Sequence, residues 1–192
     1  MRRYVIASIR MALVTLVLLG LVYPLIVTGI AQAAFPAQAN GSLVISATGT
    51  TVGSSLIGQR FTDAKYFHGR PSAAGADGYD AAASGASNLG PTSKALMDRV
   101  RCDVAIAVAD DPGLSAGAIP VDMVTASGSG LDPDITVANA YAQLPRVART
   151  RGLAVATIRG IVDARVVGRQ FGVLGEPRVN VLLLNMMLDA AK

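Results

Sequence analysis

A charge-free apolar stretch, Met11 to Phe35, constrains the fold of this 192-residue chain more than any other feature. As an α-helix rising about 1.5 Å per residue, it would exceed the ~30 Å hydrocarbon core of a bilayer. It contains thirteen Leu, Val, Ile and Phe side chains. At about 0.3 to 0.6 kcal/mol each, such side chains favour insertion by roughly 4 to 8 kcal/mol in total. We therefore predict a transmembrane helix over residues 11–35.

Pro24 lies in the middle of this predicted helix. Proline has no backbone N–H, so one carbonyl in the preceding turn loses its hydrogen bond. We expect a kink at this point, and a kink inside the bilayer usually needs a neighbouring protein helix to satisfy the freed carbonyl. Pro24 is therefore a first candidate for contact with a partner.

Basic residues flank only one end of the apolar stretch, where Arg2, Arg3 and Arg10 precede it. The positive-inside rule then keeps residues 1–10 in the cytoplasm and exports the chain from Pro36 onward, so we expect a single-pass protein of the bacterial inner membrane. A cleaved signal peptide is the alternative, because Ala31-Gln32-Ala33 resembles an A-x-A cleavage site. The length of the apolar stretch favours the anchor, since signal peptides have ~7 to 15 apolar residues.

The net charge of +4 comes mainly from the three N-terminal arginines, which leaves +1 for the rest of the chain. Nucleic-acid binding is not supported by so small a charge. The exported charge is nevertheless divided, with 6 basic and 10 acidic residues from Arg60 to Tyr141 but 7 basic and 2 acidic from Arg146 to Arg178. This polarity favours an oriented protein interface. The single Cys102 cannot form an internal disulfide, and we interpret it as a small buried core residue.

After a linker over residues 36–41, we predict one α+β domain over residues 42–192. Its first part contains two β-like pieces, Ser42–Ser46 and Thr51–Ile57, separated by glycine. Residues 72–91 consist almost entirely of small and polar residues, which predicts a long surface loop.

Helical spacing of apolar residues begins after Pro91, with Thr92 or Ser93 as cap and a stop at Asp111-Pro112-Gly113. Residues 121–125 alternate like a strand, and Asp132-Pro133 has the chemistry of a helix start. A further helix is predicted over residues 155–167, whereas the segment from Arg178 fits a strand, a helix, or a strand leading into a helix. In the helix after Pro133, we expect the core-facing residues to be Val137, Tyr141, Leu144 and Ala148. We expect Arg146 and Arg149 to face the solvent.

The motifs of common enzyme and nucleotide sites are missing from the sequence. Residues 126–130 read Ala-Ser-Gly-Ser-Gly, which lacks the first glycine of a nucleophile elbow, and no lysine follows a Walker-type glycine pattern. With one His and one Cys, we expect no metal site. The candidate anion or nucleotide loop is the strand-to-helix turn of Ser127, Gly128, Ser129 and Gly130, whose amides would lie at a helix N-terminus. A triad of Ser127 or Ser129 with His68 and Asp132 remains an alternative, because triads assemble in space.

The most aromatic run of the chain, residues 61–71, surrounds its only histidine. Aromatic and arginine side chains often dominate the energetics of protein interfaces. We therefore interpret this run as an exposed loop that binds a partner, with Tyr66, Phe67, His68 and Arg70 as interface candidates beside Pro24. The alternative for His68 is a loop histidine without a binding role.

Several blocks of sequence together resemble a known family. They are Val22-Tyr23-Pro24-Leu25, residues 38–43, 56–61, 66–72, 84–91, 124–133, 145–148 and 175–182. In this content and order, the chain resembles the KdpC family, the C subunits of the bacterial Kdp potassium-transporting ATPase. Two departures are Asp134, where many relatives carry His, and residues 164–168, which replace a more polar stretch.

The resemblance implies a non-catalytic subunit of an ATP-driven, high-affinity K⁺ uptake complex. Its partners would be a channel-like K⁺-translocating subunit, a P-type ATPase subunit and a small single-helix subunit. The family is described as an assembly factor and as a catalytic chaperone that raises the ATP affinity of the ATPase subunit. Because the predicted topology exports residues 127–133 while ATP is cytoplasmic, we expect ATP to bind at the level of the complex. A membrane-anchored hydrolase and a domain that itself binds nucleotide are the alternatives.

Overall fold

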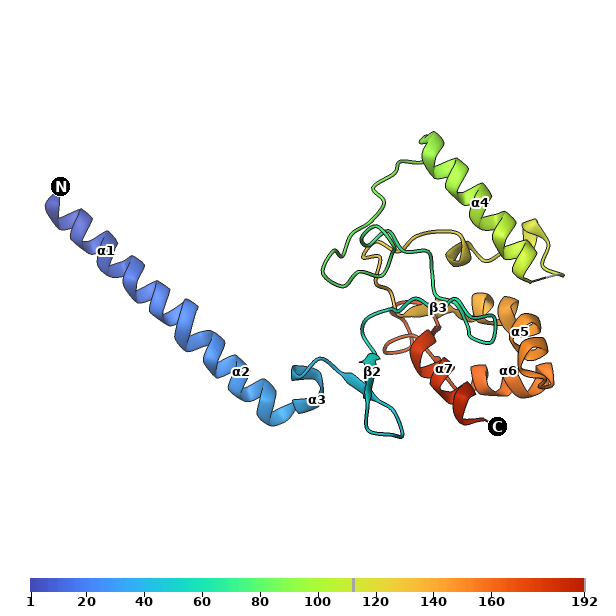
Figure 1. The fold of residues 1–192 in the computed structure, drawn as a ribbon. Coiled ribbons are helices and arrows are strands. Elements are labelled where there is room, and N and C mark those ends of the chain that lie inside the picture. The colour runs from blue at the N-terminus through green and yellow to red at the C-terminus, as the bar shows by residue number, and fades with distance from the viewer. Residues whose placement is uncertain (112, 192) are drawn as a thin grey trace. The chain divides into compact units, whose positions relative to one another are not determined.

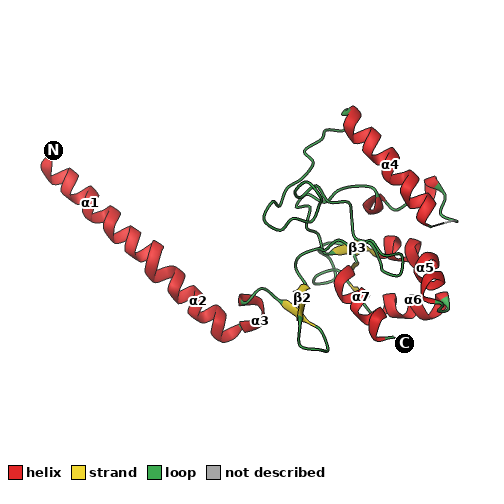
Figure 2. Ribbon diagram, in the orientation of Figure 1, coloured by secondary structure: helices red, strands yellow, loops and turns green. Residues whose placement is uncertain are grey.

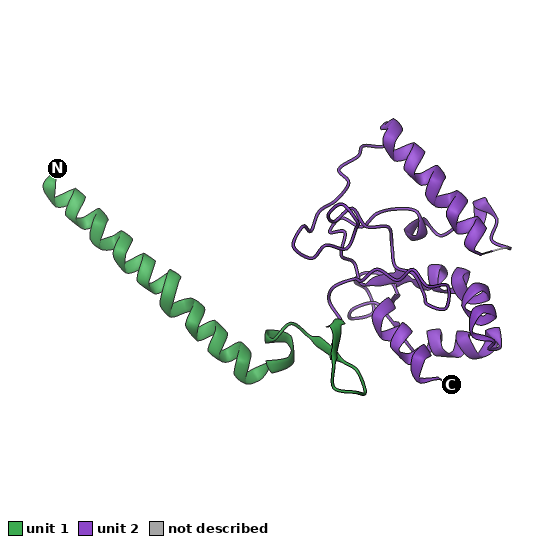
Figure 3. Ribbon diagram, viewed as in Figure 1, with its two compact units in different colours: residues 1–54 green, residues 55–192 purple. Residues whose placement is uncertain are grey.

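The structure is a computed structural model that describes residues 1–111 and 113–191. It divides into two compact units, residues 1–54 and residues 55–192 (Figure 3). The unit boundary falls after Ser54, whereas the sequence predicts that the domain begins at residue 42. With one long apolar helix and a small domain of helices and short strands, the chain has the predicted mixed α+β class.

The first unit begins with a continuous helical rod of 33 residues, Arg2–Ala34 (Figure 1). It consists of α1 (Arg2–Val17), a π-helical turn η1 (Leu18–Val22) and α2 (Tyr23–Ala34). By length and composition the rod can cross a membrane, and none of its residues is buried against other described parts of the chain. The predicted helix is present, but it starts nine residues earlier than predicted and includes the flanking arginines.

Pro24 lies in the first turn of α2, directly after the π turn. In that turn the N–H of Tyr23 donates to the carbonyl of Leu18, five residues earlier. Widening the turn by one residue accommodates a proline without breaking the helix, since proline cannot donate to the carbonyl four residues before it. The expected irregularity is thus a π turn in an otherwise continuous rod.

The remainder of the first unit is a short helix and a hairpin. Residues of the predicted linker form α3 (Pro36–Ala39), and β1 (Leu43–Ile45) pairs antiparallel with β2 (Thr51–Ser54). Both predicted β-like pieces are therefore strands, although the second ends three residues earlier than predicted.

Among its described residues, the second unit contains four α-helices and a three-stranded sheet. Figure 2 shows the helices in red and the strands in yellow. The helices are α4 (Lys94–Asp110), α5 (Val137–Arg151), α6 (Val155–Asp163) and α7 (Val181–Ala190), with the 3₁₀ turns η2 (Ala116–Ala118) and η3 (Val121–Met123). The strands are β3 (Asp134–Thr136), β4 (Val166–Val167) and β5 (Arg178–Asn180), all antiparallel in the order β3-β5-β4. The C-terminal segment is thus a strand that leads directly into a helix.

The core of this unit lies between α5, α6, α7 and the sheet. The inward positions predicted for α5 are confirmed, because Leu144 and Ala148 are buried and Val137 and Tyr141 pack against the same cluster. The largest fully buried apolar side chains around them are Phe67, Ile135, Val147, Ile158, Val162, Val179, Leu184 and Leu188. The core thus joins residues from both ends of the unit.

Helix α4 lies largely outside this core, and Ala107 is its one buried residue among those described. The predicted start is confirmed, since Ser93 is the N-cap residue. The helix ends at Asp110, whereas the predicted stop includes Pro112, which lies outside the described residues. The interpretation of Cys102 as a core residue is wrong, because the side chain is exposed on α4.

Three local predictions in the second unit are wrong. Residues 121–123 form a 3₁₀ turn instead of a strand, because Asp122 turns inward to hydrogen-bond the start of α5. The helix predicted from Pro133 begins at Val137, because residues 134–136 first pair with β5. Helix α6 ends at Asp163, and the rest of the predicted helix turns into β4.

Candidate functional site

The predicted interface segment around Phe67 is held by hydrogen bonds to two side-chain amides. Asn185 of α7 accepts a hydrogen bond from the Phe67 N–H at 2.8 Å and donates to the Phe67 carbonyl at 2.9 Å. Gln143 of α5 does the same for His68, at 2.8 Å and 3.0 Å. The two amides replace the partner that a neighbouring strand would supply, so the segment is fixed without belonging to a sheet.

Gln143 belongs to a row of buried polar residues on α5. Asn139, Gln143 and Arg146 follow at the four- and three-residue spacing that places side chains on one helix face. The Nε2 of Gln143 donates to Asn139 Oδ1 at 2.7 Å, and its Oε1 accepts from Arg146 Nη2 at 2.5 Å. Sequence reasoning missed this row, although polar residues at a core-facing helical period could have signalled it.

Arg146 is buried rather than outward-facing, so that prediction is wrong. Its Nη1 donates to the carbonyls of Ala64 and Tyr66 at 2.7 Å and 2.9 Å, and its Nε lies 3.3 Å from Asp111 Oδ2. Four acceptors satisfy a guanidinium that would otherwise be too costly to remove from water. Arg149, by contrast, is exposed as predicted.

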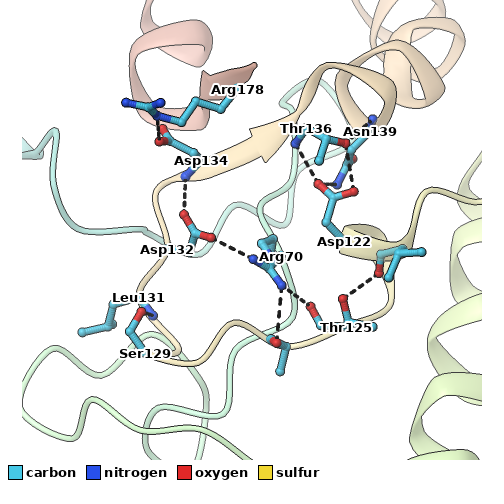
Figure 4. Close-up of polar contacts among 12 residues, drawn as sticks. Arg70, Asp122, Thr125, Ser129, Leu131, Asp132, Asp134, Thr136, Asn139 and Arg178 are labelled. Atoms are coloured by element: carbon cyan, nitrogen blue, oxygen red, sulfur yellow. Dashed lines mark hydrogen bonds and ion pairs between the residues drawn. The ribbon is translucent and has the colours of Figure 1, made fainter. Parts of the chain in front are cut away.

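At the other end of the row, Asp122 organises the start of α5 (Figure 4). Its carboxylate accepts from the Thr136 N–H at 2.8 Å, the Thr136 hydroxyl at 3.0 Å and Asn139 Nδ2 at 3.0 Å. Thr136 caps the helix, since its hydroxyl accepts from the Asn139 N–H at 3.1 Å. The negative charge therefore lies at the N-terminus of α5, where the helix dipole favours it.

Arg70 joins the two segments that the sequence analysis singled out (Figure 4). Its Nη1 lies 2.9 Å from Asp132 Oδ2, and its Nη2 lies 3.5 Å from the carbonyls of Thr125 and Ala126. The other oxygen of Asp132 accepts from the Asp134 N–H at 3.0 Å, and Asp134 in turn pairs with Arg178 at 2.8 Å. Burial raises the pKa of Asp134, while Arg178 opposes this shift.

The loop of Ser127 to Gly130 is held by hydrogen bonds within the loop and from Ser72. The N–H of Gly130 donates to the Ser127 carbonyl at 3.4 Å, and that of Leu131 donates to Ser129 Oγ at 3.1 Å. The Gly130 carbonyl accepts from Ser72 Oγ at 2.6 Å. Because the next helix begins at Val137, the predicted position of this loop at a helix N-terminus is wrong. Anion or nucleotide binding by Ser127, Gly128, Ser129 and Gly130 stays a prediction.

Among the described residues, no hydrogen bond joins the groups of the alternative triad, and the Ser127 hydroxyl is buried without a partner. His68 Nε2 lies 3.2 Å from the Asp63 carbonyl, while Asp132 binds Arg70 and Ser129 Oγ accepts from a backbone amide. Burial and the neighbouring Arg146 lower the pKa of His68. The arrangement therefore provides no Ser–His–Asp relay through these residues.

A cavity of about 410 Å³ lies between these segments, and its lining mixes three arginines with four aspartates. Three atoms of lining residues, Arg70 Nε, Asp103 Oδ2 and Asp111 Oδ1, are buried and have no hydrogen-bond partner among the described residues. Burial raises the pKa of Asp111, against the opposing effect of Arg146. Burial also raises the pKa of Tyr79, another lining residue, to about 12. A lining of both signs favours ordered water over an ion of either charge.

The predicted interface candidates are thus divided between core and surface. Phe67 is fully buried, so it cannot be a contact for a partner without unfolding. His68 and Arg70 are partly buried in the cavity wall, and Tyr66 donates from its hydroxyl to Asp189 at 2.8 Å. Pro24 is exposed on the helical rod. Among residues 1–111 and 113–191, no three His, Cys, Asp or Glu side chains converge on a metal position.

Comparisons with known proteins identify the family. The sequence profile described as "K+-transporting ATPase, c chain" matches residues 5–190. A protein of Caulobacter vibrioides is 58% identical over 184 residues, 96% of this chain and 91% of the relative. One of Koribacter versatilis is 54% identical over 192 residues, 100% of this chain and 97% of the relative. One of Gemmatimonas aurantiaca is 60% identical over 171 residues, 89% of this chain and 84% of the relative. All three are named "Potassium-transporting ATPase KdpC subunit". Matched over nearly its whole length, the chain belongs to the KdpC family of potassium-transporting ATPase subunits.

Proposed function

We propose that this chain is a non-catalytic subunit that assembles and stabilises a K⁺ uptake complex and modulates ATP use by its P-type ATPase subunit. Membership in a family named for an ATPase subunit supports this proposal. The partners are a channel-like K⁺-translocating subunit, the ATPase subunit and a small single-helix subunit.

The observation that carries the proposal is the helical rod of residues 2–34, which none of the described residues covers. Such a rod needs lipid around it, and the backbone change at Pro24 offers a site where a neighbouring helix can pack. The chain is then held in the inner membrane as part of a larger assembly.

The proposed topology places residues 1–10 in the cytoplasm and the second unit outside it, because the arginines precede the apolar segment. ATP is therefore bound by the partner on the opposite side of the membrane. An effect on ATP affinity is then a coupling free energy transmitted through the complex, typically about 1 to 3 kcal/mol or 5- to 150-fold.

A gene deletion with separate readouts tests this function. Cells lacking only this subunit should fail to grow at micromolar K⁺, and complexes purified without it should be recovered poorly or show a weaker ATP affinity. A strain that grows normally and contains an intact complex with unchanged ATP affinity would contradict the proposal.

The topology is tested separately by a reporter that is active only outside the cytoplasm, fused after Lys192. The unmodified fusion should be active. Replacing Arg2, Arg3 and Arg10 by Ala and adding Lys after Phe35 should lower that activity, because the flanking charge sets the orientation. An inactive unmodified fusion, with the full-length chain present in the membrane, would overturn the placement of the domain.

A further inference from the structure

The hairpin that joins β4 to β5 ends in an apolar tip, residues 169–175. Its side chains are among the most exposed of the described apolar residues in the second unit: Phe171 is 85% exposed, Val173 71% and Leu174 56%. Three neighbouring apolar side chains in water indicate a contact surface, whereas single exposed ones need no explanation.

The tip is nevertheless ordered by its own backbone. Gln170 and Leu174 exchange two hydrogen bonds of 2.9 Å, and the Gly172 N–H donates to the Arg169 carbonyl at 3.1 Å. Phe171 has φ +54°, which is rare for a bulky residue. The turn therefore holds these side chains outward without packing them against the core.

The base of the same hairpin is basic. Residues 164–178 contain three arginines and one glutamate, and Arg169 pairs with that Glu176 at 2.7 Å. Arg165 instead directs its Nε to the sulfur of Met187, at 2.7 Å, and no described carboxylate forms an ion pair with it. Its charge is thus available to an external anion.

We propose that this tip inserts into the interfacial region of an anionic phospholipid bilayer, with Phe171, Val173 and Leu174 below the headgroups and Arg165 at the phosphates. Apolar residues combined with arginine are typical of interfacial anchors, and charge complementarity favours lipid phosphate over a neutral surface. The inference rests on the membrane anchoring proposed above. Ser55 follows Ala34 by 21 residues, so the second unit starts within about 70 Å of the rod even when that segment is fully extended.

Site-specific fluorescence of the full chain in lipid vesicles tests the proposal. A Phe171→Cys change in a Cys102→Ser background carries an environment-sensitive dye at the tip, and the unmodified chain labelled at the exposed Cys102 of α4 is the matched control. Vesicles contain phosphatidylcholine with or without phosphatidylglycerol, plus a lipid that carries a quencher near the headgroup. Because Phe171 is exposed, the change removes no core packing, which an unchanged thermal melt verifies.

With phosphatidylglycerol, the tip label should shift to shorter wavelength and be quenched, whereas the label at Cys102 should not. Adding Arg165→Gln should lower the bound fraction at the tip by up to about fivefold, since one basic residue near an anionic surface is worth about 1 kcal/mol. Equal quenching at both positions, or none at the tip, would overturn the proposal. A spectral shift of the tip label that occurs only when the other subunits are present, and without quenching by the lipid, would overturn the proposal in favour of a protein contact. Extraction of the vesicles with alkaline carbonate separates this result from a failure of anchoring, because an anchored chain stays in the pellet whatever the tip does.

Discussion

Arg146 and Asp111 form a buried ion pair across 35 residues of sequence, with Nε 3.3 Å from Oδ2 and both side chains 4% exposed. The pair ties the segment after α4 to the middle of α5. Replacing such a pair by apolar residues is often neutral, whereas removing one partner leaves an uncompensated charge. We infer that the pair specifies which segments meet.

Arg146→Ala should lower the free energy of unfolding by about 3 to 5 kcal/mol, because it leaves Asp111 unpaired and frees the carbonyls of Ala64 and Tyr66. Urea unfolding of the chain in detergent, followed by circular dichroism, measures the loss. The exposed neighbour provides the control, since Arg149→Ala should change stability by no more than about 0.5 kcal/mol. An Arg146→Met, Asp111→Leu double variant should recover most of the lost stability if the pair mainly specifies which segments meet. Equal losses of stability in Arg146→Ala and Arg149→Ala would contradict the prediction.

The two phenylalanines Phe67 and Phe171 should respond in opposite ways to truncation. Phe67 is fully buried in the core, so Phe67→Ala should destabilise by about 3 to 5 kcal/mol. Phe171→Ala should stay within about 0.5 kcal/mol, since its side chain is exposed. Urea midpoints of the two variants compare them directly, and a stable Phe67→Ala protein would reinstate the segment around it as a free surface loop.

The parts of the fold that follow from local periodicity could be predicted from sequence. The membrane-length helix, the two short strands within residues 43–54, the loop of residues 72–91 and the apolar inward positions of α5 all depend on composition or spacing within a few residues. In each case the distant contacts that these elements make leave the locally encoded conformation unchanged.

The errors arose where a distant partner decides the conformation. Asp132-Pro133 has good helix-start chemistry, but Asp132 is held by Arg70, 62 residues earlier, and the chain then pairs with β5 before α5 begins. Phe67 was read as part of an exposed loop because the amide that satisfies its backbone, Asn185, lies 118 residues away. The polar partners that decide these conformations are distant in the sequence, so local patterns do not reveal them.

His68 should make stability depend on pH near neutrality. Burial and Arg146 lower its pKa, against the opposing effects of the Asp63 carbonyl, Asp110 and Asp111. The unfolded imidazole titrates near pH 6.5. The folded protein therefore gains stability from neutral His68 above about pH 6.5 and loses it as the pH falls through the lowered folded pKa.

The measurement compares the native chain with a His68→Gln variant at pH 7 and pH 5. Lowering the pH from 7 to 5 should reduce the free energy of unfolding more for the native chain than for the variant. Aspartates with raised pKa values, such as Asp111 and Asp134, act in the opposite direction but are present in both proteins. A difference that is constant between the two pH values would remove His68 as the titrating group.

Pro24 should matter for assembly more than for folding of the second unit. Pro24→Ala restores an N–H that can donate to the Gly20 carbonyl, which should convert the π turn into regular α-helix. Since each residue turns an α-helix by about 100°, the rod on the two sides of the turn would then present different faces to a neighbouring helix. A hydrogen bond between membrane helices is worth about 0.6 to 1.7 kcal/mol, so loss of one such contact should weaken association with the partner subunits by about 3- to 18-fold. Recovery of the complex through a tag on the K⁺-translocating subunit, at rising detergent concentration, measures this change.

Gly29→Ala is the control, because its added Cβ meets nothing within 4 Å and the backbone bonding of α2 is unchanged. If Pro24→Ala and Gly29→Ala chains co-purify as well as the native chain, the π turn serves only to accommodate the proline, and partner contacts must come from other faces of the rod.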